Sequence, residues 1–356
     1  MAGQPAVAVS GPGGADSVPG VDTTALADWF VRSLPELPMA VPRVTLISGG
    51  RSNLTYQLDG GPQPLVLRRP PLGHVLATAH DMGREYRVME ALATTGVPVP
   101  RMVALCTDDS VLGSPFYLME KVNGVVHRSG EDLDRLGGAS GRLLGHALVD
   151  VLADLHSVDP QAVGLAGFGR PEGFMARQLR RWLDQLASSR TRDLPGAEEL
   201  ADRLAASLPR SPRPALVHGD YRLDNVIADP AAPGRIAAVL DWEMATLGDP
   251  LSDLGMFCVY WDGLGGLGEA VPPAPGCAEG WPSREELVDR YAVRSGVPVG
   301  DLDWYVAFAF FKIAAILEGI HCRHLQGLTL GAGFDRIAAA VPVLIERGHA
   351  ALLGRQ

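Results

Sequence analysis

Two aspartates and an asparagine in the segment 216–254 have side chains that could catalyse the transfer of a phosphoryl group. Asp220 and Asn225 lie five residues apart, and Asp241 follows the apolar run 236–240. A carboxylate on a tight loop can orient and deprotonate an attacking hydroxyl, while asparagine and aspartate oxygens can hold metal ions that neutralise phosphate charge. The pattern indicates a magnesium-dependent phosphoryl transferase. The alternative is that these residues cap helices or occupy solvated turns, where Asp and Asn are common.

Three short motifs in this region resemble those of the aminoglycoside phosphotransferase-like enzyme family, which consists of small-molecule kinases with a protein-kinase-like fold. They are HGDxxxxN at 218–225, the aspartate that begins DWE at 241–243, and GDPxxDL at 248–254. Together, in this order and at these spacings, they are far more specific than a single HGD triplet. The resemblance extends over roughly residues 40–350, most of the chain.

The resemblance implies that Asp220 is the catalytic base and that Asn225 and Asp241 bind Mg²⁺, with ATP as the phosphoryl donor. The acceptor would be the hydroxyl group of a small molecule. A rival interpretation is a pseudokinase that binds nucleotide and has a regulatory role. The joint presence of all three residues counts against it, because a non-catalytic protein does not need them.

Three further residues of the motifs are expected to support the site. His218 is expected to brace the catalytic loop by hydrogen bonding to main chain near Asp241. Asp249 lies at a predicted helix start, where its side chain can cap the helix. Asp253 is expected to hold the catalytic loop.

The turn 48–53 joins two predicted strands, at the position where a kinase places a loop over the ATP phosphates. Its glycines allow backbone N–H groups to approach phosphate oxygens, and the side chains of Ser52 and Asn53 can add donors. The turn has neither a GxGxxG nor a Walker A sequence, and alone it would indicate a plain hairpin. We predict that Ser52 and Asn53 contact the nucleotide.

The strand 65–69 is expected to supply a cation to the phosphates. Protein kinases place a lysine here, and this sequence has arginine, which can grip phosphate oxygens bidentately. Side chains alternate along a strand, so Arg68 shares a face with Val66, and we choose Arg68 for that reason. Arg69 is the rival. Glu85, on a predicted helix, is placed to pair with the arginine.

Residues 116–124 resemble the family's hinge between the two lobes. The resemblance implies that adenine binds main-chain groups there, at the Glu120 carbonyl and the Val122 amide. Side chains contribute little to such contacts, so the motif tolerates many sequences.

The segments 170–174 and 177–182 resemble a subgroup of the family, the kinase-like domain fused to certain acyl-CoA dehydrogenases. That resemblance implies a hydroxylated acyl substrate such as a hydroxyacyl-CoA or hydroxy acid. Arg177 and Arg181, with Arg180 between them, fall on one helix face that could meet an acceptor phosphate. A solvated basic face is the alternative, and an aminoglycoside or amino alcohol is the rival acceptor.

The composition indicates a soluble globular protein. Of its 356 residues, 47% are hydrophobic and 20% are charged, and the formal net charge of −10 argues against nucleic-acid binding. The N-terminus lacks the features of a signal peptide, and the apolar run 304–320 contains Lys312 and Glu318, which favours a buried helix over a membrane span. We predict a cytoplasmic protein with no nucleic-acid or membrane partner; the sequence does not indicate an oligomeric state.

The elements that must position these residues predict an α+β, two-lobed protein-kinase-like fold. Residues 1–20 are expected to be a disordered tail, 21–123 a nucleotide-binding N-lobe, and 124–356 a helical C-lobe with the catalytic loop and acceptor site. The expected N-lobe is a mostly antiparallel sheet with one inserted helix, with strands at 43–48, 54–58, 64–68, 102–106 and 116–120 and the helix from 82 to 96. Helices are expected in the C-lobe at 143–156, 174–189, 198–208, 251–260, 284–295, 304–325 and 334–353.

Overall fold

The computed structural model describes residues 18–49, 53–72, 81–264, 274–327 and 334–354. Ser52 and nearly all of the expected N-terminal tail lie outside the described residues. The chain forms two compact units, one made of 1–86 and 102–121 and the other of 87–101 and 122–356.

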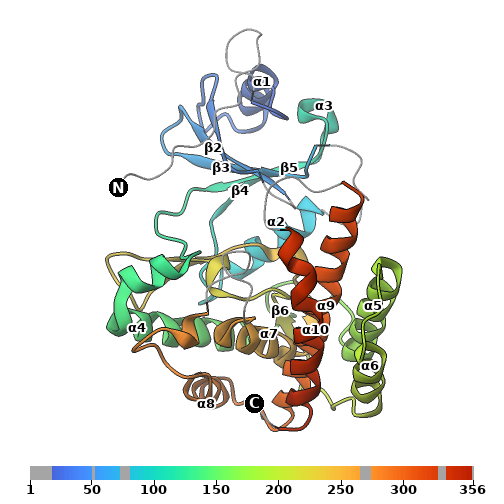
Figure 1. Ribbon diagram of the computed structural model, residues 1–356. Coiled ribbons are helices and arrows are strands. Elements are labelled where there is room, and N and C mark those ends of the chain that lie inside the picture. Colours follow the sequence, from blue (N-terminus) through green and yellow to red (C-terminus); the bar gives the residue numbers. More distant parts are fainter. Residues whose placement is uncertain (1–17, 50–52, 73–80, 265–273, 328–333, 355–356) are drawn as a thin grey trace. The chain divides into compact units, whose positions relative to one another are not determined.

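The first unit is built on a five-stranded antiparallel sheet with the order β1-β2-β3-β5-β4 (Figure 1). Helix α2 (Met82–Leu92) lies between β3 and β4 in the sequence, as the expected N-lobe pattern required. The short helix α3 (Asp109–Leu112) was not predicted, because a single turn leaves no periodic pattern. The strands are β1 (Arg43–Gly49), β2 (Leu54–Asp59), β3 (Leu65–Arg69), β4 (Met102–Cys106) and β5 (Phe116–Glu120).

The two faces of this sheet have different neighbours. Leu67 of β3 and Phe116 of β5 are buried in a core that also contains Trp29 and Phe30 of helix α1 (Thr23–Ser33). Trp29 and Phe116 meet edge to face, with ring centroids 5.1 Å apart. Because side chains alternate along a strand, Arg68 points away from this core and sits opposite Tyr117 of β5.

The second unit is mostly helical (Figure 1). Its long helix α9 packs against α5, α6, α7 and α10, and α4 packs against α8. Helix α4 begins earlier than expected, because it includes a first helical segment that a kink at Gly137 (φ 74°, ψ 162°) separates from the rest. The helices are α4 (Gly130–Ser157), α5 (Phe174–Ser189), α6 (Ala197–Ala206), α7 (Pro250–Asp262), α8 (Arg284–Ser295), α9 (Leu302–Leu325) and α10 (Phe334–Ala351).

Helix α9 is the one described helix with the length and apolar character of a membrane span. Within the protein, 78% of its most apolar window is buried, which fits the core helix expected from its sequence. Lys312 lies in this buried stretch.

Two pairs of short strands flank the loop 218–225 and the segment that contains Asp241. β6 (Ala215–Val217) pairs with β9 (Thr246–Gly248), and β7 (Val226–Ala228) pairs with β8 (Ile236–Val239), both antiparallel. The loop 218–225 therefore leaves one pair and enters the other, and Asp241 lies on the return segment between β8 and β9. β9 was not predicted from the sequence, since three residues with a terminal glycine carry no alternation.

Candidate functional site

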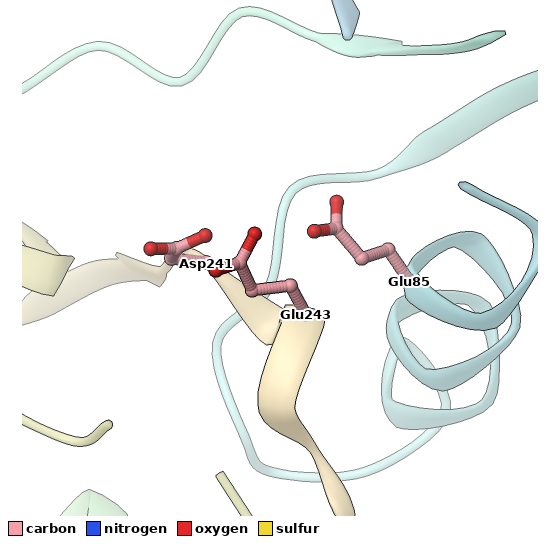
Figure 2. A group of neighbouring side chains, drawn as sticks. All are labelled: Glu85, Asp241 and Glu243. Atoms are coloured by element: carbon pink, nitrogen blue, oxygen red, sulfur yellow. The ribbon is translucent and has the colours of Figure 1, made fainter. Parts of the chain in front are cut away.

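The Glu85 carboxylate accepts hydrogen bonds from three side chains of the first unit. Arg68 donates to it through Nε (3.0 Å to Oε2) and Nη2 (3.3 Å to Oε1), and the Tyr117 hydroxyl donates at 2.6 Å. The Asn53 amide donates to Oε1 at 3.2 Å. Figure 2 shows Glu85 projecting from α2, and the residue is 1% exposed. The ion pair fixes the planar Arg68 guanidinium in one orientation, as bidentate recognition of phosphate requires. Tyr117 was missed, because its partner lies on another element.

Arg69 has a different environment. It is 5% exposed, and its Nη1 donates to the carbonyls of Gly20 and Leu112, the latter at 2.9 Å. Burial lowers the pKa of this guanidinium, and the nearby Tyr56 hydroxyl opposes the shift. Arg69 thus ties the segment before α1 to the end of α3.

The expected hinge residues lie at the boundary of the two units in the sequence. Glu120 ends β5, and its carboxylate accepts a hydrogen bond from Gln63 Nε2 at 2.6 Å. Val122 is the first residue of the second unit after that strand. Their main-chain contacts with adenine stay a prediction.

Asp220 and Asn225 meet directly within the loop 218–225. Asn225 Nδ2 donates to the Asp220 carbonyl (2.9 Å) and to its Oδ2 (3.1 Å). Arg222 Nε also donates to Oδ2, at 3.1 Å. In the described part of the chain both side-chain bonds to this carboxylate go to Oδ2, so Oδ1 is the oxygen on which a hydroxyl proton could be received. The Asn225 amide nitrogen is engaged, which directs its oxygen elsewhere.

Arg222 joins two carboxylates of the loop. Besides Asp220 it pairs with Asp224 through Nη1 at 3.2 Å, and its guanidinium lies 5.0 Å from the ring centroid of Tyr260. Burial raises the pKa of the Asp224 carboxyl, against the attraction of Arg222. Asp224 Oδ1 is buried without a hydrogen-bond partner in the described residues. This bridge was not predicted, because Arg222 and Asp224 occupy variable positions of HGDxxxxN.

The loop 218–225 is bonded through Leu240 to the segment that ends at Asp241. The Leu240 amide donates to the Asn225 carbonyl at 2.8 Å, and His218 Nε2 lies 2.8 Å from the Leu240 carbonyl. The Asp220 amide donates to His218 Nδ1 at 3.3 Å. A carbonyl only accepts and an amide only donates, so the neutral tautomer protonated on Nε2 satisfies both bonds. His218 therefore lies where the sequence placed it, braced against main chain beside Asp241.

Asp253, in the first turn of α7, anchors the start of the loop 218–225. Its Oδ2 accepts from the His218 amide (2.6 Å) and its Oδ1 from the Gly219 amide (2.8 Å), while His156 Nε2 lies 3.3 Å from Oδ2. Gly219 has φ +87°, and a Cβ there would lie 2.8 Å from Met244 Cβ, so the loop needs glycine. Burial opposes ionisation of Asp253, but its bonds from His156 and His218 hold its pKa below the usual value.

Replacing this carboxylate should destabilise the protein. In Asp253→Asn one of the two backbone N–H groups faces an amide NH₂, and an unsatisfied buried donor costs about 1–3 kcal/mol. Because the folded-state pKa lies below the unfolded one, the ionised carboxylate stabilises the fold above the unfolded pKa, and this contribution is lost as pH falls through the folded pKa. Denaturant unfolding at neutral and acidic pH measures the free energy of unfolding. The value for Asp253→Asn should be lower than that of the wild type at neutral pH, and the difference should become smaller as the pH falls. Asp289→Asn, at an exposed position of α8, is the control; a neutral-pH deficit no larger than that of the control would contradict the anchoring role.

Asp249 has the capping role expected of it. It is the N-cap residue of α7, where its Oδ1 accepts from the Leu251 amide at 3.0 Å, and its Oδ2 accepts from the Tyr305 hydroxyl at 2.6 Å. Burial raises the pKa of this carboxyl, against the hydrogen bond from Tyr305. The residue ties α7 to α9.

Asp241 has a backbone conformation that few non-glycine residues adopt. With φ 67° and ψ 60°, it is the one described non-glycine residue with positive φ. Such strain is typical of functional positions. Figure 2 shows the Asp241 and Glu243 side chains on this short segment, and their carboxylate oxygens lie within 4.8 Å of each other. Mg²⁺ prefers oxygen ligands, so the carboxylates of Asp241 and Glu243 and the Asn225 amide oxygen fit that ion chemically. Glu243 was not assigned from the sequence.

The basic face of α5 is only partly as expected. Arg177, Arg180 and Arg181 are exposed. Arg177, however, donates to the carbonyls of Glu172 and Arg170, so it secures the turn before α5. The helical spacing predicted that the three arginines share a face, but it did not predict that main-chain carbonyls would bind the Arg177 guanidinium. Arg181 lies over the Trp182 ring, 5.3 Å from its centroid.

Lys312 is a residue of the site that the sequence did not single out. It comes from α9, and its Nζ donates to the Gly219 carbonyl at 2.9 Å, next to Asp220. The available signal was a basic residue inside the apolar run FAFFKIAA. Such a run indicates a core helix, and only the fold shows which loop the lysine reaches.

The chain is similar to known proteins over most of its length. The model of the phosphotransferase enzyme family matches residues 43–287. Mouse acyl-CoA dehydrogenase family member 10 is 39% identical over 285 residues, 78% of this chain and 26% of that protein. Chicken acyl-CoA dehydrogenase family member 11 is 37% identical over 337 residues, 92% of this chain and 43% of that protein. The chain thus spans less than half the length of these relatives.

A solved structure agrees with these matches. A putative aminoglycoside phosphotransferase from Ralstonia eutropha is 36% identical and superposes with a TM-score of 0.82, covering 94% of this chain and 98% of that one. The α+β fold class expected from the sequence is confirmed by this likeness and by the antiparallel and helical lobes described above.

Proposed function

Because this chain belongs to the phosphotransferase enzyme family, we propose that it is a magnesium-dependent small-molecule kinase that transfers the γ-phosphate of ATP to an acceptor hydroxyl. The observation that carries the proposal is the bonding of Asp220 to Asn225, with Asp241 tied to the same loop through Leu240. We assign nucleotide binding to residues 21–123 and the acceptor site to 124–356.

Asp220 acts as the base. Its Oδ2 is held by Arg222 and Asn225, so the carboxylate keeps one orientation and presents Oδ1 to the acceptor hydroxyl. A base held in this way removes the proton as the hydroxyl oxygen attacks the γ-phosphorus. The bond from phosphorus to the bridging oxygen breaks, and ADP leaves.

Asp241 and Asn225 would hold Mg²⁺, with Glu243 as a further oxygen donor of the same segment. The ion supplies neutralisation of charge on the phosphates when bound. The protein's part is to present these oxygens on a backbone fixed by Leu240, so that little rearrangement is needed.

Arg68 would contact the phosphates, held in position by Glu85. Glu85→Gln removes the charge from this ion pair, and we expect the KM for ATP to rise about 10-fold, equivalent to roughly 1.4 kcal/mol, with a smaller effect on kcat. Steady-state kinetics with varied ATP measures this. Glu90→Gln, on the exposed side of α2, is the matched control. An unchanged KM in Glu85→Gln would remove the pair from the nucleotide site.

For the acceptor, we propose a hydroxylated acyl compound, either a hydroxyacyl-CoA or a free hydroxy acid. The support is the identity with the acyl-CoA dehydrogenase family members, of which this chain matches only a part. An aminoglycoside or amino alcohol is the second candidate, favoured by the name of the Ralstonia relative.

The test is ADP release from Mg·ATP across a panel of hydroxyacyl-CoAs, hydroxy acids, amino alcohols and aminoglycosides. Acceptor-dependent ADP would establish the kinase and name the class of its substrate. Tight nucleotide binding without turnover on any acceptor would favour the pseudokinase interpretation.

A further inference from the structure

Lys312 is a buried cation whose one hydrogen bond in the described residues goes to a neutral carbonyl. The residue is 6% exposed, and its Nζ donates to the Gly219 carbonyl at 2.9 Å. Among the described residues, no carboxylate oxygen lies within the 4.0 Å of an ion pair with this ammonium. An ammonium has three N–H donors, so two of them lack an acceptor.

Burial of the Lys312 ammonium destabilises the folded state. Transfer of an ammonium without an ion-pair partner from water into the protein interior is unfavourable even after the structure relaxes. Burial accordingly lowers the pKa of Lys312, and the charges of Asp220 and Asp253 partly oppose that shift. A buried charge without an ion-pair partner, close to a loop of polar residues, is a candidate for a ligand site.

The composition of the chain makes this lysine more informative. Of the 31 basic residues counted as Lys and Arg, lysine occurs only as Lys121 and Lys312. Arginine serves almost everywhere else, including the ion pairs of the surface. A compact ammonium with rotatable donors at position 312 is therefore not the product of a general use of lysine. An ammonium carries three rotatable donors on a flexible stem, whereas a guanidinium presents its donors in a fixed plane.

A second donor without a partner lies beside it. Trp182 of α5 is 7% exposed, and its indole Nε1 has no hydrogen-bond partner in the described residues. Lys312 Nζ lies 5.6 Å from the centroid of this ring, and the Arg181 guanidinium lies 5.3 Å from it. Buried polar groups are normally paired, so this excess of N–H donors indicates a ligand that supplies oxygen acceptors.

We propose that Lys312 donates a hydrogen bond to the acyl oxygen of the acceptor, a carboxylate in a hydroxy acid or a thioester carbonyl in a hydroxyacyl-CoA. This inference rests on the proposed kinase function and assigns its acceptor specificity to one residue. The acceptor's hydroxyl reaches Asp220 while its acyl oxygen meets Lys312. A cationic acceptor would bring like charge to a buried ammonium, so amino alcohols and aminoglycosides are disfavoured.

Direct binding can be read from the lysines themselves. Protein labelled with carbon-13 at lysine Cε should give two signals, and the one absent in Lys312→Met is assigned to Lys312. Saturating hydroxybutyrate or hydroxybutyryl-CoA should shift the Lys312 signal and leave Lys121 unchanged, whereas butanediol should shift neither. The two acyl probes distinguish a carboxylate from a thioester ligand. A Lys312 signal that neither acyl probe moves would overturn the inference.

Kinetics gives an independent readout. Lys312→Met should raise the KM for the acyl acceptor at least about 10-fold while leaving the KM for ATP and turnover of butanediol nearly unchanged. Arg32→Met removes an exposed cation from α1, a helix with no assigned role in the site, and should change none of these values. Equal losses on acyl and neutral acceptors would instead place Lys312 at the transferred phosphoryl group and contradict the inference. Absence of turnover by the wild-type protein on every acceptor would refute the kinase proposal itself.

Stability separates a binding role from a structural one. Met has a similar volume and removes the buried charge, so the thermal midpoint of Lys312→Met should equal or exceed that of the wild type. A clearly lower midpoint would mean that the bond to Gly219 stabilises the fold, and Lys312 would then be a structural residue.

Discussion

Asp220→Ala should lower kcat by about 10²–10⁴-fold, the range that loss of a general base produces. The variant retains Arg68, Glu85, Asn225 and Asp241, so its affinity for Mg·ATP should stay within about threefold of wild type. Single-turnover phosphoryl transfer, together with titration of nucleotide by calorimetry, measures the two quantities separately.

The matched control is Asp224→Ala, which also removes a carboxylate paired with Arg222 in the same loop. Asp224 does not bond to Asn225 in the described structure, and its loss should lower kcat much less. Turnover retained by Asp220→Ala would refute the role of Asp220. Comparable losses in both variants would mean that the charge balance around Arg222 matters more than a specific base.

Asp241→Asn should abolish most of the magnesium-dependent part of nucleotide affinity. Loss of a supporting partner outside the metal's own ligands already costs about 10–100-fold in metal affinity. Loss of a ligand carboxylate should therefore weaken Mg·ATP binding at least about 100-fold. The measurement is nucleotide affinity with Mg²⁺ and with a chelator, because the wild-type protein and the variant should differ only when the ion is present.

Asparagine is the informative substitution at this position because of the backbone. Asn tolerates the left-handed conformation of Asp241 (φ 67°) better than Ala does, so the variant tests charge with little added strain. Glu243→Gln, two residues on, reports on the neighbouring carboxylate. Unchanged nucleotide affinity in Asp241→Asn would remove the metal assignment.

The sequence predicted those features that depend on local pattern. The bounds of β4, β5, α5 and α8 follow from alternation or helical periodicity, and the α+β class follows from their order. Alternation also separated Arg68 from Arg69, because adjacent residues of a strand occupy opposite faces. His218 and Asp253 were expected to support the loop because their motif spacing brings them to it.

What the sequence did not predict depends on contacts between distant segments. Tyr117 reaches Glu85 across 32 residues, and Lys312 reaches Gly219 across 93. Neither contact leaves a periodic signal, since it requires the folded positions of two elements. Arg177 shows the opposite failure: its helical spacing was correct, but nearby main-chain carbonyls compete for its guanidinium.

The backbone bonds of Leu240 have a consequence for how this protein could be altered. Its N–H and C=O bond to Asn225 and His218, so the loop of the proposed proton acceptor and the proposed metal segment are linked through one residue. Amide hydrogen exchange at Leu240 should then report the opening of both together. By contrast, Trp182 comes from α5, which contributes no residue to this linkage. New acceptors could therefore be selected in a laboratory evolution experiment by changing α5, whereas a change of Lys312 in α9 would also remove its bond to Gly219 beside Asp220.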